Sequence, residues 1–384
     1  MKKNSIHVQI ALVGGQPTPV YQGIVHLHPD QVVLICSSES EKVAKDIKVQ
    51  LPSYQDKDVM IYKMSDTNLE EMYQTAESIQ QVLPKGIRIS LNITGGMKLW
   101  TVIFNNVFRR YRRSCHTFFI GQNGTFFDLK EKSSGGTVAF DMDAQFKILG
   151  HTLDEYTLLS DYTAEDYQVL NTVQMLGFGS ATHYHLYKIT ALFLEEYRKK
   201  YNNVLFKQDF SVTERYNALS WNATTHEFAC QLGTRSYVFS SPHVEHILLN
   251  TGWFELYVAR LIAKKYGNEN VRLNCIFRNV KHLPKNEIDI IVNTGSKLIF
   301  VECKTQIYNT TDIDKFRSAV RNYGGLGSKP LFVTNSEMSP EGLEKCLDHR
   351  ITTFYLDNPA YATQNDKVAA LGGILEKLDK TWNV

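Results

Sequence analysis

The stretch NEIDIIVNTGSKLIFVECK, residues 286–304, decides how the second half of the chain folds. Two apolar runs flank the polar residues 293–296 (NTGS), a pattern that predicts two antiparallel strands joined by a turn. Side chains alternate faces along a strand, so Glu287 shares a face with Asp289, and Glu302 shares a face with Lys304. The turn brings the charged ends of both strands side by side, among Ile, Val and Phe residues that would otherwise form a buried sheet.

Two carboxylates held together repel each other unless a cation joins them. Hard divalent ions such as Mg²⁺ and Mn²⁺ prefer oxygen ligands. A lysine beside such an ion can orient or help deprotonate a water, as a catalytic base, or offset charge that develops on a phosphate. The preceding helical segment GWFELYVARLIAKK carries Glu255, which can point to the same place. The alternative is a pair of surface strand ends with an ordinary salt bridge at Lys304.

Bulk properties limit the class of protein. A chain of 384 residues suggests two or three domains. Its 42 basic and 40 acidic residues give a net charge of +2, which neither demands nor excludes a nucleic-acid partner. No apolar run approaches the roughly 18 residues that span a bilayer, so no membrane role is expected. The six cysteines form no C-x-x-C pair, which disfavours zinc ribbons and disulfides and favours the cytoplasm.

Residues 1–145 alternate strand-like and helix-like segments, which predicts a doubly wound, Rossmann-like α/β domain with a parallel sheet. The expected strands cover 7–14, 31–38, 58–65 and 88–96, and the expected helices cover 39–51, 68–83 and 97–113. Residues 14–24 (GGQPTPVYQGI) are expected to form a loop, and residues 116–130 a hairpin around Asn123 and Gly124. Residues 133–140 (SSGGTVAF) read as the exit from this domain.

The rest of the chain divides into a connecting segment and a second α/β domain. Residues 146–240 are expected to be largely helical, with a mixed pattern after 204. In residues 241–384 a helix over 243–267, with a possible kink near Thr251 and Gly252, precedes three strands at 271–278, 287–293 and 297–304. A helix, a strand at 329–335, further alternation and a closing helix near 366–379 complete the pattern.

A first candidate site lies in the N-terminal domain, because ligands of doubly wound sheets bind beyond the carboxyl ends of the strands. Glycines there let backbone N–H groups approach an anion, and a helix start adds a favourable partial charge. Neither glycine loop matches a dinucleotide fingerprint or a P-loop, and either could simply make a tight turn. The candidate residues for a phosphate-bearing ligand are Gly14, Gly15, Gln16, Thr18, Pro19, Ser37, Ser38, Thr94, Gly95, Gly96, Met97 and Lys98.

The order of the charged residues in the second candidate site resembles a nuclease superfamily. Glu255, then Glu287-Ile288-Asp289, then Glu302-Cys303-Lys304 is similar to the PD-(D/E)xK restriction-endonuclease-like pattern, with Ile288 at the position of its proline. The resemblance implies that Asp289, Glu302 and the Cys303 carbonyl bind Mn²⁺ or Mg²⁺. It further implies that Lys304 is the catalytic lysine, with Glu255 in a supporting role and Gln306 near a metal-bound water or a phosphate.

With this C-terminal half, the N-terminal half resembles a CARF domain, the Rossmann-like sensor of type III CRISPR immunity. The residues that carry this likeness are the loops GGQPTP and TGGMK. Together the halves resemble CRISPR ancillary nucleases. That resemblance implies activation by a cyclic oligoadenylate, most often the tetramer, bound across a homodimer, and metal-dependent cutting of nucleic acid.

Two other functions fit the same sequence. One is a constitutive restriction or repair nuclease whose N-terminal domain serves only dimerisation. The other is a non-catalytic, ligand-sensing regulator of transcription that acts through the helical middle segment. The sequence does not distinguish DNA from RNA substrates, set the size of the activator ring, or indicate whether the sensor domain degrades it.

Overall fold

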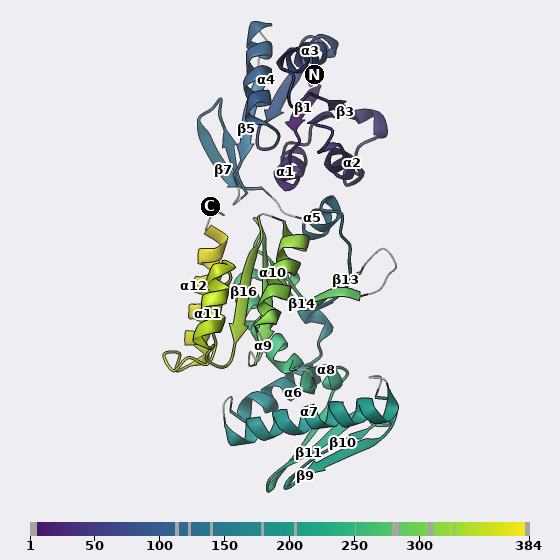
Figure 1. The fold of residues 1–384 in the computed structure, drawn as a ribbon, viewed down its shortest axis with the longest axis vertical. Helices are drawn as coiled ribbons and strands as arrows, with labels where there is room; N and C mark the ends of the chain where they lie inside the picture. The colour runs from purple at the N-terminus through teal and green to yellow at the C-terminus, as the bar shows by residue number, and fades with distance from the viewer. Residues whose placement is uncertain are drawn as a thin grey trace, which may run out of the picture.

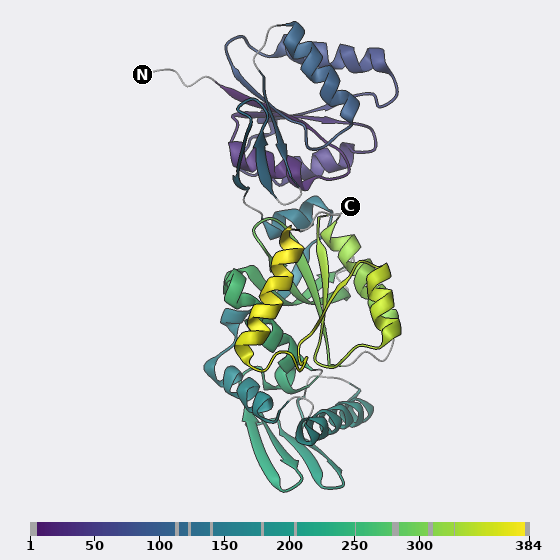
Figure 2. The same cartoon turned by 90° about the vertical axis from the view of Figure 1, so that its left-hand side faces the viewer.

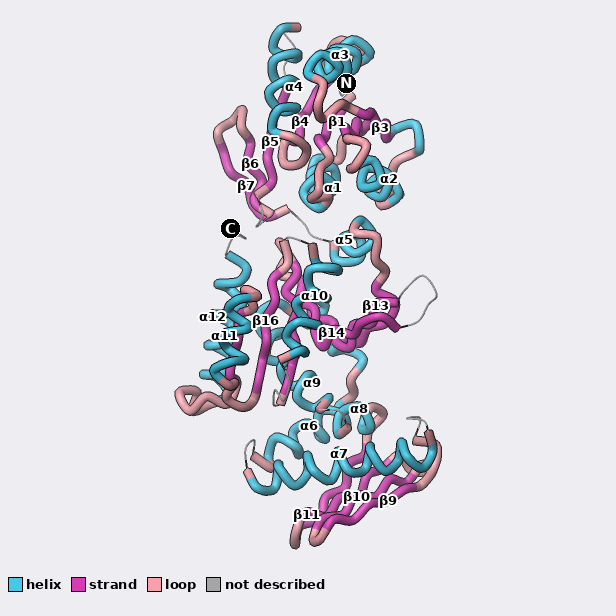
Figure 3. Tube along the Cα trace, viewed as in Figure 1, coloured by secondary structure: helices cyan, strands magenta, loops and turns pink. Residues whose placement is uncertain are grey.

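The computed structural model describes residues 6–111, 115–121, 124–138, 141–177, 180–202, 206–249, 251–278, 284–305, 310–325 and 327–380. The molecule is elongated, with three units following one another along its long axis (Figures 1 and 2). The N-terminal domain occupies one end and the C-terminal sheet domain the middle. A small unit made from the connecting segment occupies the other end, as the colouring by secondary structure makes clear (Figure 3).

The N-terminal domain is a seven-stranded sheet in the order β3-β2-β1-β4-β5-β6-β7, with helices on both faces (Figure 2). The first five strands pair in parallel and the last two antiparallel. This confirms the predicted Rossmann-like fold, and the order reverses between β1 and β4, where such sheets bind ligands. The strands are β1 His7–Leu12, β2 Gln31–Cys36, β3 Val59–Lys63, β4 Arg88–Asn92, β5 Cys115–Ile120, β6 Thr125–Asp128 and β7 Ser133–Thr137.

The helices of this domain include one that was predicted as a loop. Residues Thr18–Leu27 form α1. Pro17 caps this helix and Pro19 lies in its first turn, where proline is tolerated because those backbone N–H groups have no acceptor within a helix. The expectation of a loop was therefore wrong. The expected exit at 133–140 likewise begins with strand β7. The other helices are α2 Glu41–Val49, α3 Leu69–Val82 and α4 Lys98–Arg110.

The C-terminal domain is a mixed six-stranded sheet in the order β17-β16-β15-β14-β13-β8. The predicted hairpin is present, because β14 and β15 pair antiparallel, whereas β15, β16 and β17 are parallel. The strands are β13 Val271–Arg278, β14 Pro284–Asn293, β15 Leu298–Lys304, β16 Lys329–Thr334 and β17 Thr352–Tyr355. The helices are α8 Val244–Leu248, α9 Gly252–Tyr266, α10 Thr311–Gly324, α11 Pro340–Asp348 and α12 Gln364–Lys380. The predicted kink is a break between α8 and α9 at Thr251, whose φ is +64°.

The connecting segment contains more strand than the largely helical expectation allowed. Its first strand, β8 Leu153–Leu158, is the edge of the C-terminal sheet and pairs with β13. Helices α6 Ala164–Met175 and α7 Ala181–Tyr201 follow, and then a four-stranded antiparallel sheet packs on α7. Its strands are β9 Phe210–Glu214, β10 Asn217–Asn222, β11 Glu227–Leu232 and β12 Arg235–Ser240. Among the described helices, none has the length and apolar character needed to cross a membrane.

One short helix joins the two main domains. Helix α5, Met142–Ile148, contains the predicted domain boundary at residue 145. Ala144 and Ile148 pack into the core of the N-terminal domain. Met142 and Phe146 pack into the core of the C-terminal domain, where the Phe146 ring meets Phe277 edge-on at 5.0 Å between centroids. Burying apolar side chains on both sides makes α5 part of both domains.

Candidate active site and sensor loops

The hairpin β14–β15 gathers the predicted catalytic residues. The paired residues farthest from the turn are Ile290 and Val301. Asp289 follows one position farther from the turn, and its carboxylate reaches across to β15. There Asp289 Oδ2 accepts a hydrogen bond from the Cys303 backbone N–H at 2.7 Å. Lys304 Nζ lies 2.7 Å from Glu302 Oε1 and 3.7 Å from Asp289 Oδ2. The structure therefore brings together the predicted set of Asp289, Glu302, Cys303 and Lys304.

Two further carboxylates approach this cluster from either side. Glu255 lies in the first turn of α9. Burial, and then the nearby charge of Asp289, raise the pKa of Glu255 well above its usual value. Glu287 lies on β14 nearer the surface, and loss of water followed by repulsion from Asp289 raises its pKa as well. Glu255 thus takes the neighbouring position expected of a supporting residue, whereas Glu287 is more exposed.

The electrostatics of the cluster are unbalanced. Burial, and then the Asp289 charge, raise the pKa of Glu302 to about 8. Burial also raises the pKa of Asp289, although Lys304 opposes that effect. Desolvation acts against the charge on Lys304, but Asp289 and Glu302 hold the pKa of this lysine well above its usual range. A single cation thus faces several buried carboxylates, an arrangement that disfavours their ionisation and favours binding of a further cation.

The donor set fits a divalent metal of the hard, oxygen-binding kind. Within the described part of the chain, no three His, Cys, Asp or Glu side chains are close enough to form a metal-binding group. The candidate ligands are instead the carboxylates of Asp289 and Glu302 and the backbone carbonyl of Cys303. Asp289 contacts both the Cys303 N–H and Lys304 through Oδ2, so its second carboxylate oxygen, Oδ1, is the one proposed for a cation. Oxygen donors of this type suit Mg²⁺ and Mn²⁺, with water completing the shell. Gln306 lies outside the described residues.

The two glycine loops of the N-terminal domain lie against each other. A Cβ added to Gly14 would lie 2.7 Å from the backbone nitrogen of Gly96, and one added to Gly95 would lie 2.3 Å from the Leu12 carbonyl oxygen. Gly96 has φ +69°, which glycine adopts without strain. The close approach of the two loops explains why Gly14, Gly95 and Gly96 carry no side chain. Both loops lie at the switch point between β1 and β4.

The remaining sensor residues surround this point. Ser40 Oγ donates to the Val13 carbonyl at 3.2 Å, which holds the turn containing Ser37 and Ser38 beside the first loop. The Thr94 hydroxyl donates to Asn92 Oδ1 at 2.7 Å and accepts from the Ile120 N–H at 2.8 Å, so it has a structural role. The exposed members of the predicted set are Gly15, Gln16, Ser38, Met97 and Lys98.

Two contacts that sequence reasoning missed tie the sensor loop to the other domain. The Thr18 hydroxyl donates to Gln145 Oε1 on α5. On the same helix, Asp143 forms a bidentate ion pair with Arg272 of β13, with N–O distances of 2.5 and 3.1 Å. Residues more than a hundred positions apart meet here, and no local pattern in the sequence indicates such pairs.

These features define a doubly wound α/β domain joined to a mixed-sheet domain with a carboxylate–lysine cluster. Residues 8–150 match the family model described as the Card1 CARF domain. The chain therefore contains a CARF domain of the Card1 type, which confirms the resemblance stated for its N-terminal half. None of the curated proteins matches the sequence.

Solved structures share the architecture of the whole chain. Can2 from Sulfobacillus thermosulfidooxidans, in complex with cyclic tetra-adenylate (cA4), matches with a TM-score of 0.69 at 16% identity, over 97% of both chains. Protein VC1899 from Vibrio cholerae matches with a TM-score of 0.70 at 13% identity, over 97% of this chain and 98% of that one. A type III CRISPR defence DNA nuclease activated by cyclic oligoadenylate matches at 0.53 and 14% identity, over 89% of this chain and 51% of that one. At these identities the likeness establishes the fold.

Proposed function

We propose that this protein is a nuclease of type III CRISPR defence that a cyclic oligoadenylate activates and that hydrolyses DNA or RNA phosphodiesters with a divalent metal. The observation that carries the proposal is the cluster of Asp289, Glu302 and Lys304 on one hairpin. It is supported by the match of the complete fold to a protein solved with cA4. All six cysteines are free, which suits the reducing cytoplasm where such a defence acts.

The chemistry assigns different work to each side chain. Asp289, Glu302 and the Cys303 carbonyl hold the metal. When bound, Mn²⁺ or Mg²⁺ lowers the pKa of water and neutralises charge on the phosphate. Lys304 Nζ lies 2.7 Å from Glu302 Oε1 and 3.7 Å from Asp289 Oδ2, where its positive charge stabilises negative charge that develops on the phosphate. Glu255 supports the cluster from α9 without being a ligand.

The sensor site is proposed to bind a ring of nucleotides across a homodimer. Backbone N–H groups at Gly95 and Gly96 and the exposed cation of Lys98 face the phosphates, and Gln16, Thr18 and Ser38 approach ribose or base edges. Beside this loop, Met97, Leu99 and Val102 are 38%, 41% and 52% exposed. Exposed apolar side chains of this kind are favourable at a subunit interface. A two-fold dimer presents each loop twice to a symmetric ring, and cA4 is the activator we favour.

Helix α5 is the proposed route from activator to nuclease. Thr18 of the sensor loop holds Gln145, and two residues earlier Asp143 holds Arg272 on β13, next to the catalytic hairpin. A cavity of about 120 Å³ lies between this loop and the hairpin tip near Ser296 and Lys297. From Lys297 to Glu302 the strand spans about 17 Å, at ~3.3 Å per residue. Both contacts lie at the turn end of the hairpin, because Arg272 pairs with Ile291 and Lys297 directly precedes β15, so movement of the loop on binding cA4 would reach the catalytic residues along these strands.

The test is a cleavage assay on labelled single- and double-stranded DNA and RNA with Mn²⁺, with and without cA4. The proposal predicts cutting only when both are present, and none by Glu302→Gln. Glu344→Gln removes an exposed carboxylate on α11 and serves as the matched control that cuts like wild type. Cutting at the same rate without cA4 indicates a constitutive nuclease. Absence of cutting on every substrate, with cA4 bound, indicates a sensing protein without catalysis.

A further inference from the structure

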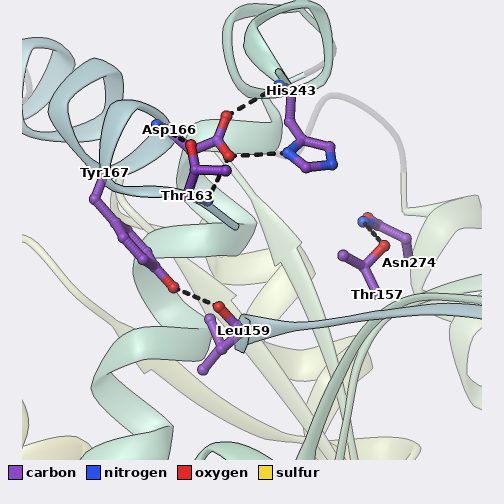
Figure 4. A network of polar contacts seen from close by, with 7 residues as sticks. All are labelled: Thr157, Leu159, Thr163, Asp166, Tyr167, His243 and Asn274. Atoms are coloured by element: carbon purple, nitrogen blue, oxygen red, sulfur yellow. Dashed lines mark hydrogen bonds and ion pairs between the residues drawn. The ribbon is translucent and has the colours of Figure 1, made fainter. Parts of the chain in front are cut away.

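A buried aspartate beside the nuclease domain orients an exposed histidine. Asp166, in the first turn of α6, is completely buried. Its carboxylate accepts hydrogen bonds from the Thr163 N–H at 2.7 Å, the His243 N–H at 3.0 Å and His243 Nδ1 at 2.9 Å (Figure 4). The Thr163 contact belongs to the capping box of α6. The two contacts to His243 join segments 77 residues apart and have no role in capping that helix.

This arrangement fixes which nitrogen of the imidazole is available. Nδ1 donates its proton to Asp166, so Nε2 is the atom left to meet another group. In Figure 4 the ring extends away from Asp166, with Nε2 on its far side. The side chain of His243 is 38% exposed, whereas that of Asp166 has no exposed surface. With Nδ1–H held by Asp166, a ring that carries a second proton presents Nε2–H, which can donate to an anion.

The histidine lies on the flank of the candidate active site. The Tyr162 ring stacks at a tilt against His243, with 5.2 Å between centroids. The turn Leu159–Asp161, which directly precedes Tyr162, contacts α9, the helix that carries Glu255. The chain of neighbours from Asp166 through His243 and Tyr162 therefore leads to the helix that supports the nuclease cluster.

A second line of neighbours reaches the same place from the sheet. Asn274 of β13 lies opposite Asp289, because its neighbours Leu273 and Cys275 pair with Ile290 and Ile288. Asn274 has φ +51° and donates from Nδ2 to the Thr157 hydroxyl at 3.3 Å. Figure 4 shows this pair on the side to which the His243 ring extends.

The two lines of neighbours meet between Tyr162 and Asn274. The Tyr162 hydroxyl and Asn274 Oδ1 are both buried, and the two side chains are close enough to interact with each other. Tyr162 is only 6% exposed, so these side chains form the buried base on which the His243 ring rests.

We propose that His243, held by Asp166, contacts a backbone phosphate of the nucleic-acid substrate next to the one that is cut. This inference rests on the proposed nuclease function and assigns a substrate-contacting residue outside the carboxylate–lysine motif. An oxygen of that phosphate accepts the Nε2–H of the ring protonated at both nitrogens, while Tyr162 packs against the ring and holds it in place. Contacts to phosphate set position and affinity but do not read sequence.

The experiment measures binding apart from cutting. The affinities of labelled single-stranded DNA, single-stranded RNA and duplex DNA are titrated with cA4 present, in the Glu302→Gln background, which does not cut. Adding His243→Gln is expected to weaken binding of the preferred nucleic acid by about 5- to 10-fold. It should also lower the slope of log affinity against log salt by about 0.7 to 0.9, the value of one phosphate contact. His243→Arg, which restores a cation, should recover most of the affinity.

The control is His349→Gln. His349 also pairs with an aspartate, Asp314, at 2.9 Å, but this pair is exposed and lies between α10 and α11. The His349→Gln substitution should therefore leave the affinity for nucleic acid unchanged. Equal affinities for the His243→Gln and parent proteins overturn the inference, as does a loss of melting temperature with no change in affinity or salt slope. Failure of the parent to bind any of the nucleic acids overturns the proposed function and this inference together.

Discussion

Replacing Glu302 by glutamine should stabilise the metal-free protein while removing its response to metal. Glu302 is buried beside Asp289, and its pKa rises from 4.5 to about 8. In the unfolded chain the same group ionises near pH 4.5. Between these values the folded state binds more protons than the unfolded state, so stability decreases as pH rises. Below pH 4.5 the group contributes nothing, and above about pH 8 its full cost is present.

The size of the effect follows from those two values. Each pH unit between 4.5 and 8 corresponds to about 1.4 kcal/mol, so Glu302 costs roughly 2 kcal/mol at pH 6, where the folded protein keeps it protonated, and roughly 5 kcal/mol at pH 8. Glutamine avoids this cost and can still accept a hydrogen bond from Lys304, which lies 2.7 Å from Glu302 Oε1. The pKa of about 8 already includes the attraction to Lys304, so we expect the variant to be more stable than wild type by roughly 4 kcal/mol at pH 8.

The assay is urea unfolding in EDTA at about pH 6 and pH 8, repeated with Mn²⁺. Wild type should lose about 3 kcal/mol between the two pH values from this group, and Glu302→Gln should lose much less. Mn²⁺ should stabilise wild type, by about 2.7 kcal/mol at one hundred times its Kd, and should not stabilise the variant. Equal Mn²⁺ stabilisation of both proteins, or a variant less stable than wild type at pH 8 in EDTA, would refute the reasoning.

Further predictions concern the lysines, the coupling helix and the glycine loops. Lys304→Met should lower the cleavage rate at least 100-fold, as loss of an electrostatic stabiliser does, with cA4 affinity in a direct titration unchanged. Lys98→Ala should weaken cA4 binding with no change in Mn²⁺ stabilisation, and an unaltered Kd for cA4 would remove this residue from the site. Gln145→Ala should change cA4 affinity by no more than a few-fold. It should reduce the activation of cleavage by cA4 at least 5-fold, the lower end of ordinary allosteric coupling. Full activation of this variant would exclude α5 as the route. Gly95→Ala should destabilise the fold by about 1–3 kcal/mol, because the added Cβ would meet the Leu12 carbonyl oxygen. Gly15→Ala should not destabilise it, because the space around Gly15 is open. Equal melting temperatures for these two variants would contradict the described packing.

Much of the fold follows from short-range patterns. The hairpin around residues 293–296 was predictable because two apolar runs flank a polar turn, and pairing then sets Asp289 against β15. The parallel sensor sheet was predictable from strands that alternate with helices. Helix α1 was not, because Pro17, Pro19 and Gly23 suggest a loop unless the prolines are recognised as first-turn residues.

The parts that could not be predicted depend on contacts distant in the sequence. Strand β8 joins the C-terminal sheet more than a hundred residues ahead of its partner, and nothing in its sequence names that partner. The bond from Thr18 to Gln145 and the pairing of His243 with Asp166 arise in the same way. A motif can identify a metal site, because its ligands lie on adjacent strands, but it cannot reveal residues that other segments bring to the edge of that site.

Single-turnover cleavage with Mn²⁺, with and without cA4, tests the central claim most directly. The preferred substrate is mixed with excess wild-type protein and the first-order rate of cutting is measured. The account predicts a large increase in this rate on adding cA4, and no cutting above background by Glu302→Gln under either condition. A wild-type rate that is the same with and without cA4, or a Glu302→Gln protein that cuts at the wild-type rate, would contradict it.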